Sequence, residues 1–199
     1  NINAVINFPG AGRTGTYGLG YMLTGYDKDD NEISASGHLV DTIVYDNFSS
    51  PAMQNMGDYK YSGTTRNDYY YVNYAEGIYV GYKYYETRYE DAVLNQGKAG
   101  DYDYAATVQY PFGYGLSYTT FDWSDFNVTE PDADGNMTVS LTVTNTGDRR
   151  GKDVVQVYVQ APYTEYDEEY GVEKASVSLV GFAKTGYIEK GGHEDVEIT

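Results

Sequence analysis

Apolar and polar residues alternate cleanly over the last third of the chain. Four apolar residues interleave there with Thr and Ser, namely Met137, Val139, Leu141 and Val143. Alternation with a period of two predicts an antiparallel strand with one buried face. Three further apolar runs predict more strands, at 154–159, 179–183 and 195–198. Short strands separated by turn residues, such as those at 145–148, favour a β-sandwich.

The first part of the chain has a different pattern. Residues 1–8 alternate apolar and polar positions and stop at Pro9-Gly10, which predicts a short strand followed by a loop. Residues 14–23 carry apolar side chains at helical spacing, and Gly25 follows as a stop signal for a helix. Residues 39–45 are rich in β-branched side chains, which predicts another strand.

Tyrosine dominates the composition between these two parts. The chain has 25 Tyr against 6 Phe and 1 Trp, and the densest group of tyrosines lies between residues 59 and 89. Tyrosine suits half-buried surfaces, where the ring is covered and the hydroxyl stays in water. The alternative is a sugar-binding surface of aromatic faces. We favour half-buried packing, because the tyrosines form a continuous segment rather than spaced platforms.

Residues 108–121 separate the first part of the chain from the alternating pattern of its last third. We call this stretch the aromatic hinge. It reads Val-Gln-Tyr-Pro-Phe-Gly-Tyr-Gly-Leu-Ser-Tyr-Thr-Thr-Phe. Pro111 fixes its own φ, whereas Gly113 and Gly115 permit backbone angles or close approaches that a Cβ would block. Four aromatic side chains are available to pack against the bent backbone, namely Tyr110, Phe112, Tyr114 and Tyr118. The hinge is therefore expected to be packed, unlike a flexible linker.

Residues 110–121 closely resemble the Phe-Pro-Phe-Gly-x-Gly-Leu-Ser-Tyr-Thr-x-Phe signature of family 3 glycoside hydrolases, the β-glucosidase family. Residues 76–85 are similar to a second motif of that family, with Lys83 where arginine is usual. Residues 143–151 and 155–159 resemble its fibronectin type III-like domain. In residues 34–39, which include His38, a family motif is present without its proline.

The resemblance implies a mixed fold in three parts. Residues 1–107 are the C-terminal part of an α/β sandwich domain with a Tyr-rich irregular connection. Residues 108–121 are the hinge. Residues 122–199 form an all-β fibronectin type III-like sandwich that lacks its end, and both ends of the chain are expected to be cut.

The resemblance also implies where catalysis takes place. Glycoside hydrolysis needs two carboxyl groups that flank the bond. In the family the nucleophilic aspartate lies in a preceding barrel and the acid/base glutamate lies upstream in the sandwich domain, so no catalytic residue is expected in this chain. The expected function is the structural C-terminal portion of a retaining enzyme on terminal β-linked sugars. Its partners would be the missing barrel and sandwich portion and a neutral carbohydrate substrate.

Three residues are candidates for contact with the substrate, namely Tyr74, Glu76 and Tyr85. The aromatic setting of Glu76 would raise the pKa of its carboxyl group. The alternative, which we favour, is a structural ion pair of Glu76 with Lys83 or Arg88.

Charge and composition exclude several other functions. The 13 Lys and Arg against 30 Asp and Glu give a net charge of −17, which disfavours nucleic acid and anionic membranes. No apolar run suggests a membrane span. The chain has no cysteine, and its two histidines, His38 and His193, are far apart, so no metal site and no cofactor are expected. The acidic run 27–32 lacks the ligand spacing of an EF-hand and is predicted to be a solvated turn.

A second function stays open at this point. The chain could be an independent cell-surface β-sandwich module that binds glycan or protein through exposed tyrosines. An extracellular or cell-surface location is favoured over the cytoplasm, and association into oligomers is compatible with the sequence.

Overall fold

The computed structural model describes residues 13–35, 37–55, 71, 73–74 and 76–199. The chain divides into two compact units, each built from separate segments. The first unit comprises residues 1–39, 113–158 and 179–199, and the second comprises 40–112 and 159–178. The predicted strand at 1–8 and the Pro9-Gly10 loop lie outside the described residues.

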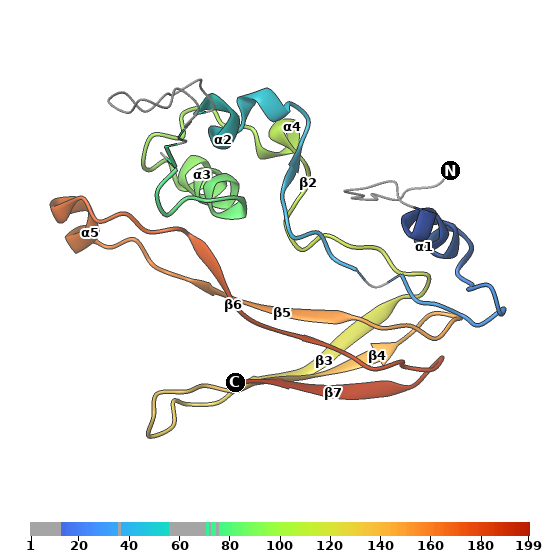
Figure 1. The fold of residues 1–199 in the computed structure, drawn as a ribbon. Coiled ribbons are helices and arrows are strands. Elements are labelled where there is room, and N and C mark those ends of the chain that lie inside the picture. Colours follow the sequence, from blue (N-terminus) through green and yellow to red (C-terminus); the bar gives the residue numbers. More distant parts are fainter. Residues whose placement is uncertain (1–12, 36, 56–70, 72, 75) are drawn as a thin grey trace, which may run out of the picture. The chain divides into compact units, whose positions relative to one another are not determined.

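Helices and strands are mixed along the chain, as Figure 1 shows. The helical elements are α1 (Arg13–Thr24), the 3₁₀ turn η1 (Asn47–Ser49), α2 (Pro51–Gln54), α3 (Tyr82–Leu94), α4 (Tyr104–Thr107) and α5 (Glu165–Tyr170). The strands are β1 (Ile43–Val44), β2 (Val108–Tyr110), β3 (Phe121–Val128), β4 (Val139–Asn145), β5 (Val154–Gln160), β6 (Val177–Lys184) and β7 (His193–Ile198). They form three open sheets, with the orders β1-β2, β3-β4-β7 and β5-β6. The mixed class is confirmed.

The core of the first unit forms around β4, where the predicted alternation is confirmed. Leu141 and Val143 of β4 are buried together with Val155, Ile188 and Val196. β4 pairs antiparallel with β7 on one side and with β3 on the other. The polar side chains between the buried positions stay partly exposed, as the period of two requires.

The strands predicted at 154–159, 179–183 and 195–198 are confirmed as β5, β6 and β7. On β5, Val155 near the start of the strand is buried, whereas Val159 near its end is exposed. On β6, Val180 and Phe182 are exposed as well. The sequence pattern therefore located these strands but overestimated how much of each apolar face is covered within this chain.

The predicted helix at 14–23 is confirmed as α1, and it ends at Gly25, which has φ of 74°. The acidic turn that follows is also confirmed. The Asp27 carboxylate accepts hydrogen bonds from the backbone N–H groups of Asp29 and Asn31, at 2.8 and 2.9 Å. These bonds lower the pKa of Asp27, the side-chain bond from Asn31 contributing most. An aspartate that closes its own turn in this way is a common turn device.

The hinge packs closely onto residues 37–39 within the first unit. The Gly113 N–H donates to the Leu39 carbonyl, and the Leu39 N–H donates to the Tyr114 carbonyl, both at 2.8 Å. Gly113 has φ of 79°, and a Cβ on Gly115 would lie 2.6 Å from the Gly37 carbonyl oxygen. Both glycines are therefore needed for the reasons that the sequence predicted, one for its backbone angle and one for a close approach.

Two predictions in the second unit need correction. The Tyr-rich connection is not irregular throughout, because residues 82–94 form the helix α3. Tyrosine is only a moderate helix former, and the helix begins at Gly81 without a side-chain cap, so the usual signals were weak. The strand predicted at 39–45 is reduced to β1, which pairs antiparallel with β2. The division at residues 107 and 121 and the fibronectin type III-like detail stay predictions.

Candidate functional site

The three predicted substrate contacts lie in different environments. Tyr74 is 80% exposed, whereas Tyr85 is 6% exposed and packs with Val44 and Val108 in the core of the second unit. Glu76 is half-buried, and its Oε2 atom has no hydrogen-bond partner. Within the described ranges, no hydrogen bond or ring contact joins these three side chains. Their role in substrate binding stays a prediction.

The favoured ion pair of Glu76 is wrong. Among the described residues, no ion pair joins Glu76 to Lys83 or Arg88. The Arg88 guanidinium instead donates to the Tyr84 hydroxyl and to the Ala99 carbonyl, each at 3.1 Å. Arg88 therefore ties α3 to the loop that follows it rather than to the segment that precedes it.

α3 is held by its aromatic face and by its C-terminal cap. Tyr82, Tyr85 and Tyr89 follow the i, i+3, i+7 spacing of one helix face. The Tyr82 ring stacks on Phe112 with the ring centroids 4.4 Å apart. The helix ends at Asn95, which adopts the left-handed conformation with φ of 54°. The sequence thus places a row of aromatic rings along a short helix with a defined C-terminal cap.

The short helix α4 positions a second group of tyrosines, which follow α3 in the sequence. Asp103 caps this single turn, since its carboxylate accepts a hydrogen bond from the Ala106 N–H at 3.1 Å. The chain then enters β2, where Val108 is buried. Because α4 is fixed between its cap and the paired strand, the tyrosines at 102 and 104 have a defined direction.

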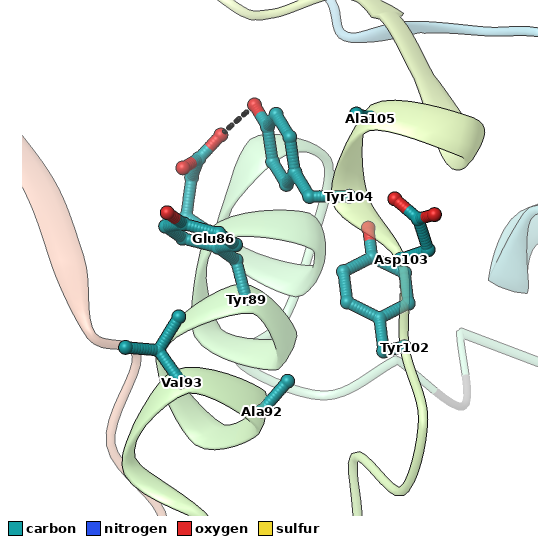
Figure 2. Close-up of a pocket in the computed structure, with 8 residues that line it drawn as sticks. All are labelled: Glu86, Tyr89, Ala92, Val93, Tyr102, Asp103, Tyr104 and Ala105. Carbon is teal, nitrogen blue, oxygen red and sulfur yellow. Dashed lines mark hydrogen bonds between the residues drawn. The ribbon is translucent and has the colours of Figure 1, made fainter.

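A pocket of about 660 Å³ lies between α3 and the 102–105 segment. We call it the α3–α4 pocket, and Figure 2 shows its lining. The lining residues are Glu86, Tyr89, Ala92, Val93, Tyr102, Asp103, Tyr104 and Ala105. Rings and methyl groups form most of the wall, and two carboxylates provide its charge. This composition is typical of a small-molecule site, which is mostly apolar with a few polar groups.

One hydrogen bond spans the pocket. The Tyr104 hydroxyl donates to the Glu86 carboxylate at 2.6 Å, the dashed line in Figure 2. Burial raises the pKa of Tyr104 far above its usual range, and the bond to Glu86 adds to the effect. The Tyr104 ring also lies 5.1 Å from the Tyr89 ring, centroid to centroid, at an interplanar angle of 60°. Tyr104 is therefore a protonated donor at neutral pH with a fixed orientation.

Arg88 does not line the pocket but contacts Tyr102, which does. The Arg88 guanidinium is 5.0 Å from the centroid of the Tyr102 ring and 5.5 Å from that of Tyr84, distances at which a cation is attracted to a ring. Burial raises the pKa of Tyr102 to about 12. The Tyr102 hydroxyl is buried, and Thr107 lies near it without forming a hydrogen bond of ordinary geometry.

Both carboxylates of the pocket already accept a hydrogen bond from within the chain. A retaining glycosidase needs one carboxylate that attacks and one that transfers a proton. Here Glu86 is bonded to Tyr104, and Asp103 caps α4. Each carboxylate thus has one oxygen committed to the structure and one that can accept a hydrogen bond from a ligand.

The described part of the chain contains no group of three or more His, Asp or Glu side chains that is arranged to hold a metal ion. His38 instead contacts the hinge, with its Nδ1 atom 2.6 Å from the Gly113 carbonyl oxygen. None of the helices formed by the described residues has the length and apolar character that a bilayer span requires.

Sequence reasoning missed Glu86, Tyr102 and Tyr104 as members of a site. Glu86 adjoins the motif at 76–85, and the other two lie between that motif and the aromatic hinge, where the sequence analysis singled out no residue. The Asp103 cap before Tyr104 was the one local signal available. Their proximity depends on the path of residues 95–101, which no spacing rule reveals.

No protein-family model matches the chain, but individual proteins do. β-Glucosidase A of Butyrivibrio fibrisolvens is 33% identical over 180 residues, which cover 84% of this chain and 18% of that protein. A β-glucosidase of Ruminococcus albus is 34% identical over 174 residues, which cover 87% of this chain and 14% of that protein. The chain thus spans less than a fifth of the length of these curated relatives.

Solved structures agree with these relatives. A β-glucosidase from Paenibacillus barengoltzii matches 92% of this chain and 16% of its own, with a TM-score of 0.65 and 31% identity. The Bifidobacterium adolescentis GH3 β-glucosidase matches 83% of this chain and 20% of its own, with a TM-score of 0.58 and 32% identity. β-Glucosidase 3B of Thermotoga neapolitana, solved with glucose, matches 83% of this chain and 19% of its own, with a TM-score of 0.58 and 34% identity.

Proposed function

This chain corresponds to a portion of the β-glucosidases of glycoside hydrolase family 3, and we propose that it is a non-catalytic, C-terminal structural portion of such an enzyme. The parent enzyme would remove terminal β-linked sugars and retain the anomeric configuration. The observation that carries the proposal is the similarity over 83–92% of this chain to only 16–20% of solved β-glucosidases. The relatives are glycoside hydrolases, which supports an origin of this chain among such enzymes.

The chemistry of the reaction bears on which part of the parent enzyme holds the reacting carboxylates. A retaining glycosidase forms a covalent glycosyl-enzyme on one carboxylate, while a second carboxyl group donates and then accepts a proton. The two carboxylates of the α3–α4 pocket each have one oxygen engaged in a structural hydrogen bond. As the resemblance to the family implies, we assign the reacting carboxylates to the rest of the parent enzyme, namely its barrel and the preceding part of its sandwich domain.

Exposed apolar side chains support a structural role. In the first unit, Trp123 and Phe126 of β3 and Phe182 of β6 are between 52% and 71% exposed. Large apolar side chains on open sheets commonly mark surfaces that contact other protein. In the parent enzyme such surfaces would pack against neighbouring parts of the fold.

The alternative of an independent cell-surface module gains no support from the relatives described above, because each is a longer enzyme. The Tyr-rich stretch also contains a core residue, Tyr85, rather than only exposed platforms.

A mechanism-based label tests the proposal. A 2-deoxy-2-fluoro-β-glucoside with a good leaving group traps the covalent intermediate on the nucleophilic carboxylate. In a mixture of this chain with the N-terminal portion of its parent, mass spectrometry is expected to find the adduct on the N-terminal portion. An adduct on any carboxylate of the 199-residue chain would overturn the proposal.

A further inference from the structure

We propose that the α3–α4 pocket binds a ring of a neutral pyranose sugar through its tyrosines and its two carboxylates. The choice of a sugar rests on the proposed function, whereas the site itself rests on the geometry of the described residues. The pocket has a volume of about 660 Å³, within the range of small-molecule sites.

The aromatic wall supplies the apolar contact. Tyr89 is 49% exposed on α3, and its ring is inclined at 60° to that of Tyr104. Two inclined rings form an angled surface rather than a flat one. The C–H face of a pyranose can lie against such a surface, because aromatic rings offer large apolar faces at a low cost in conformational entropy.

The carboxylates supply the polar contact. One oxygen of Glu86 accepts from Tyr104 and one oxygen of Asp103 accepts from Ala106. In the described structure the second oxygen of each makes no hydrogen bond, so both can accept from hydroxyl groups of a ligand. Hydrogen bonds to an ionised acceptor are shorter and stronger than neutral ones. The bond from Tyr104 also fixes the Glu86 side chain in advance, which lowers the entropy lost on binding.

The charge of the site selects for a neutral ligand. Two carboxylates in the wall and a net charge of −17 on the chain disfavour phosphorylated or acidic sugars. A cationic ligand is the main competitor, because it would be attracted to both rings and carboxylates. Arg88 already lies over the Tyr102 ring, so this ring has a cation partner within the chain, and we favour the neutral polyol.

Saturation-transfer NMR with methyl β-D-glucopyranoside and the full 199-residue chain tests the proposal. Saturable binding is expected, and methyl β-D-glucuronide is expected to bind more weakly. Tyr89→Ala is expected to weaken binding by about 3- to 10-fold, the effect of losing one aromatic contact. Tyr104→Phe keeps the ring but removes the bond to Glu86, and is expected to weaken binding as well. Tyr166→Ala, at an exposed tyrosine of α5 that does not line the pocket, is the matched control.

Three outcomes would overturn the proposal: no saturable binding to the unmodified chain, equal affinity in the Tyr89→Ala and Tyr166→Ala variants, or preferential binding of tetramethylammonium. Circular dichroism of each variant separates lost binding from lost folding. Failure of this proposal is distinguishable from failure of the proposed function, because glucoside binding is measured on the chain alone, whereas the covalent label is read on the N-terminal portion.

Discussion

The side-chain amide of Asn145 donates a hydrogen bond of 2.8 Å to the backbone carbonyl of Ile188. The same amide donates to the Arg149 carbonyl, and its oxygen accepts from the Thr119 hydroxyl and the Gly147 N–H. Asn145 is fully buried at the end of β4. One side chain thus joins the end of the hinge, the turn after β4 and the segment before β7 in the first unit.

Asn145→Ala is expected to lower the free energy of unfolding by about 2–4 kcal/mol. The substitution removes the side-chain partner of the partly buried Arg149 carbonyl and Gly147 N–H, and it leaves the Ile188 carbonyl with only the bond from the Gly151 N–H. A polar group left unsatisfied inside the protein costs more than the net value of a hydrogen bond. Urea unfolding followed by the fluorescence of Trp123, the one tryptophan of the chain, measures the change. Asn127→Ala, at an exposed position of β3, is the control, and an equal loss in both variants would contradict the role of Asn145.

Gly113→Ala and Gly20→Ala are expected to change stability in opposite directions. Alanine at 113 must adopt φ near 79°, and its Cβ would press on the Gln156 amide, so a loss of about 1–3 kcal/mol is expected. At position 20 in α1 a Cβ meets no atom within 4 Å, and alanine stabilises a helix by about 0.5–1 kcal/mol over glycine. Thermal unfolding of the two variants measures both effects. A neutral Gly113→Ala would show that the hinge tolerates a Cβ.

Acid is expected to loosen α5 through Asp167. The hydrogen bond from Lys174, at 2.6 Å, lowers the pKa of this buried carboxyl group most, and the Thr164 N–H contributes next. Because the folded pKa lies below the unfolded one, the stabilisation is fully present above the unfolded pKa and is lost as the pH falls through the folded pKa. Hydrogen exchange of residues 164–174 should therefore be faster in Asp167→Asn than in the unmodified chain at neutral pH.

The difference between Asp167→Asn and the unmodified chain should shrink in strong acid, where the native carboxylate is protonated. Glu168→Gln changes an exposed carboxylate in the same helix and serves as the control. If the difference in exchange rate between Asp167→Asn and the unmodified chain stayed constant with pH, the loss of the Asp167 charge would not be its cause.

Alkaline titration tests the electrostatics of the α3–α4 pocket. Burial raises the pKa of Tyr102 to about 12 and that of Tyr104 still further. A raised folded pKa contributes stability that is fully present below the unfolded value of 10.0 and is lost as the pH rises through the folded pKa. Both tyrosines should therefore stay protonated after most others have ionised, until the chain unfolds.

Glu86→Gln keeps the size of the side chain but removes its charge. The pKa of Tyr104 should then fall, yet stay above its ordinary value, because burial is the larger cause of its rise. NMR titration of tyrosine ring carbons measures the shift. An unchanged Tyr104 titration in Glu86→Gln would contradict the hydrogen bond that spans the pocket.

Strand periodicity could be predicted from the sequence, and the pocket could not. Leu141 and Val143 alternate with polar residues, so β4 was evident from the pattern alone. β3 was missed because its apolar alternation, Phe121 with Trp123 and then Phe126 with Val128, is interrupted by a register shift between Ser124 and Asn127. The helix α5 was missed although Thr164 and Asp167 form a capping box that is legible in the sequence.

The site depends on contacts between segments rather than on any one pattern. Arg88 reaches Ala99, and Tyr104 reaches Glu86, 18 residues away in sequence. Such pairs arise only after the loop between α3 and α4 has folded back. The aromatic hinge was predictable for the opposite reason, because proline and glycine restrict the backbone locally.

Complementation tests the central claim most directly. The 199-residue chain is mixed with the N-terminal portion of its parent, and hydrolysis of an aryl β-glucoside is followed for each part alone and for the mixture. The account predicts that neither part alone turns over substrate at the rate of the mixture and that this chain alone is inactive. Turnover by the 199-residue chain alone, or no gain when it joins an otherwise inactive N-terminal portion, would contradict the account.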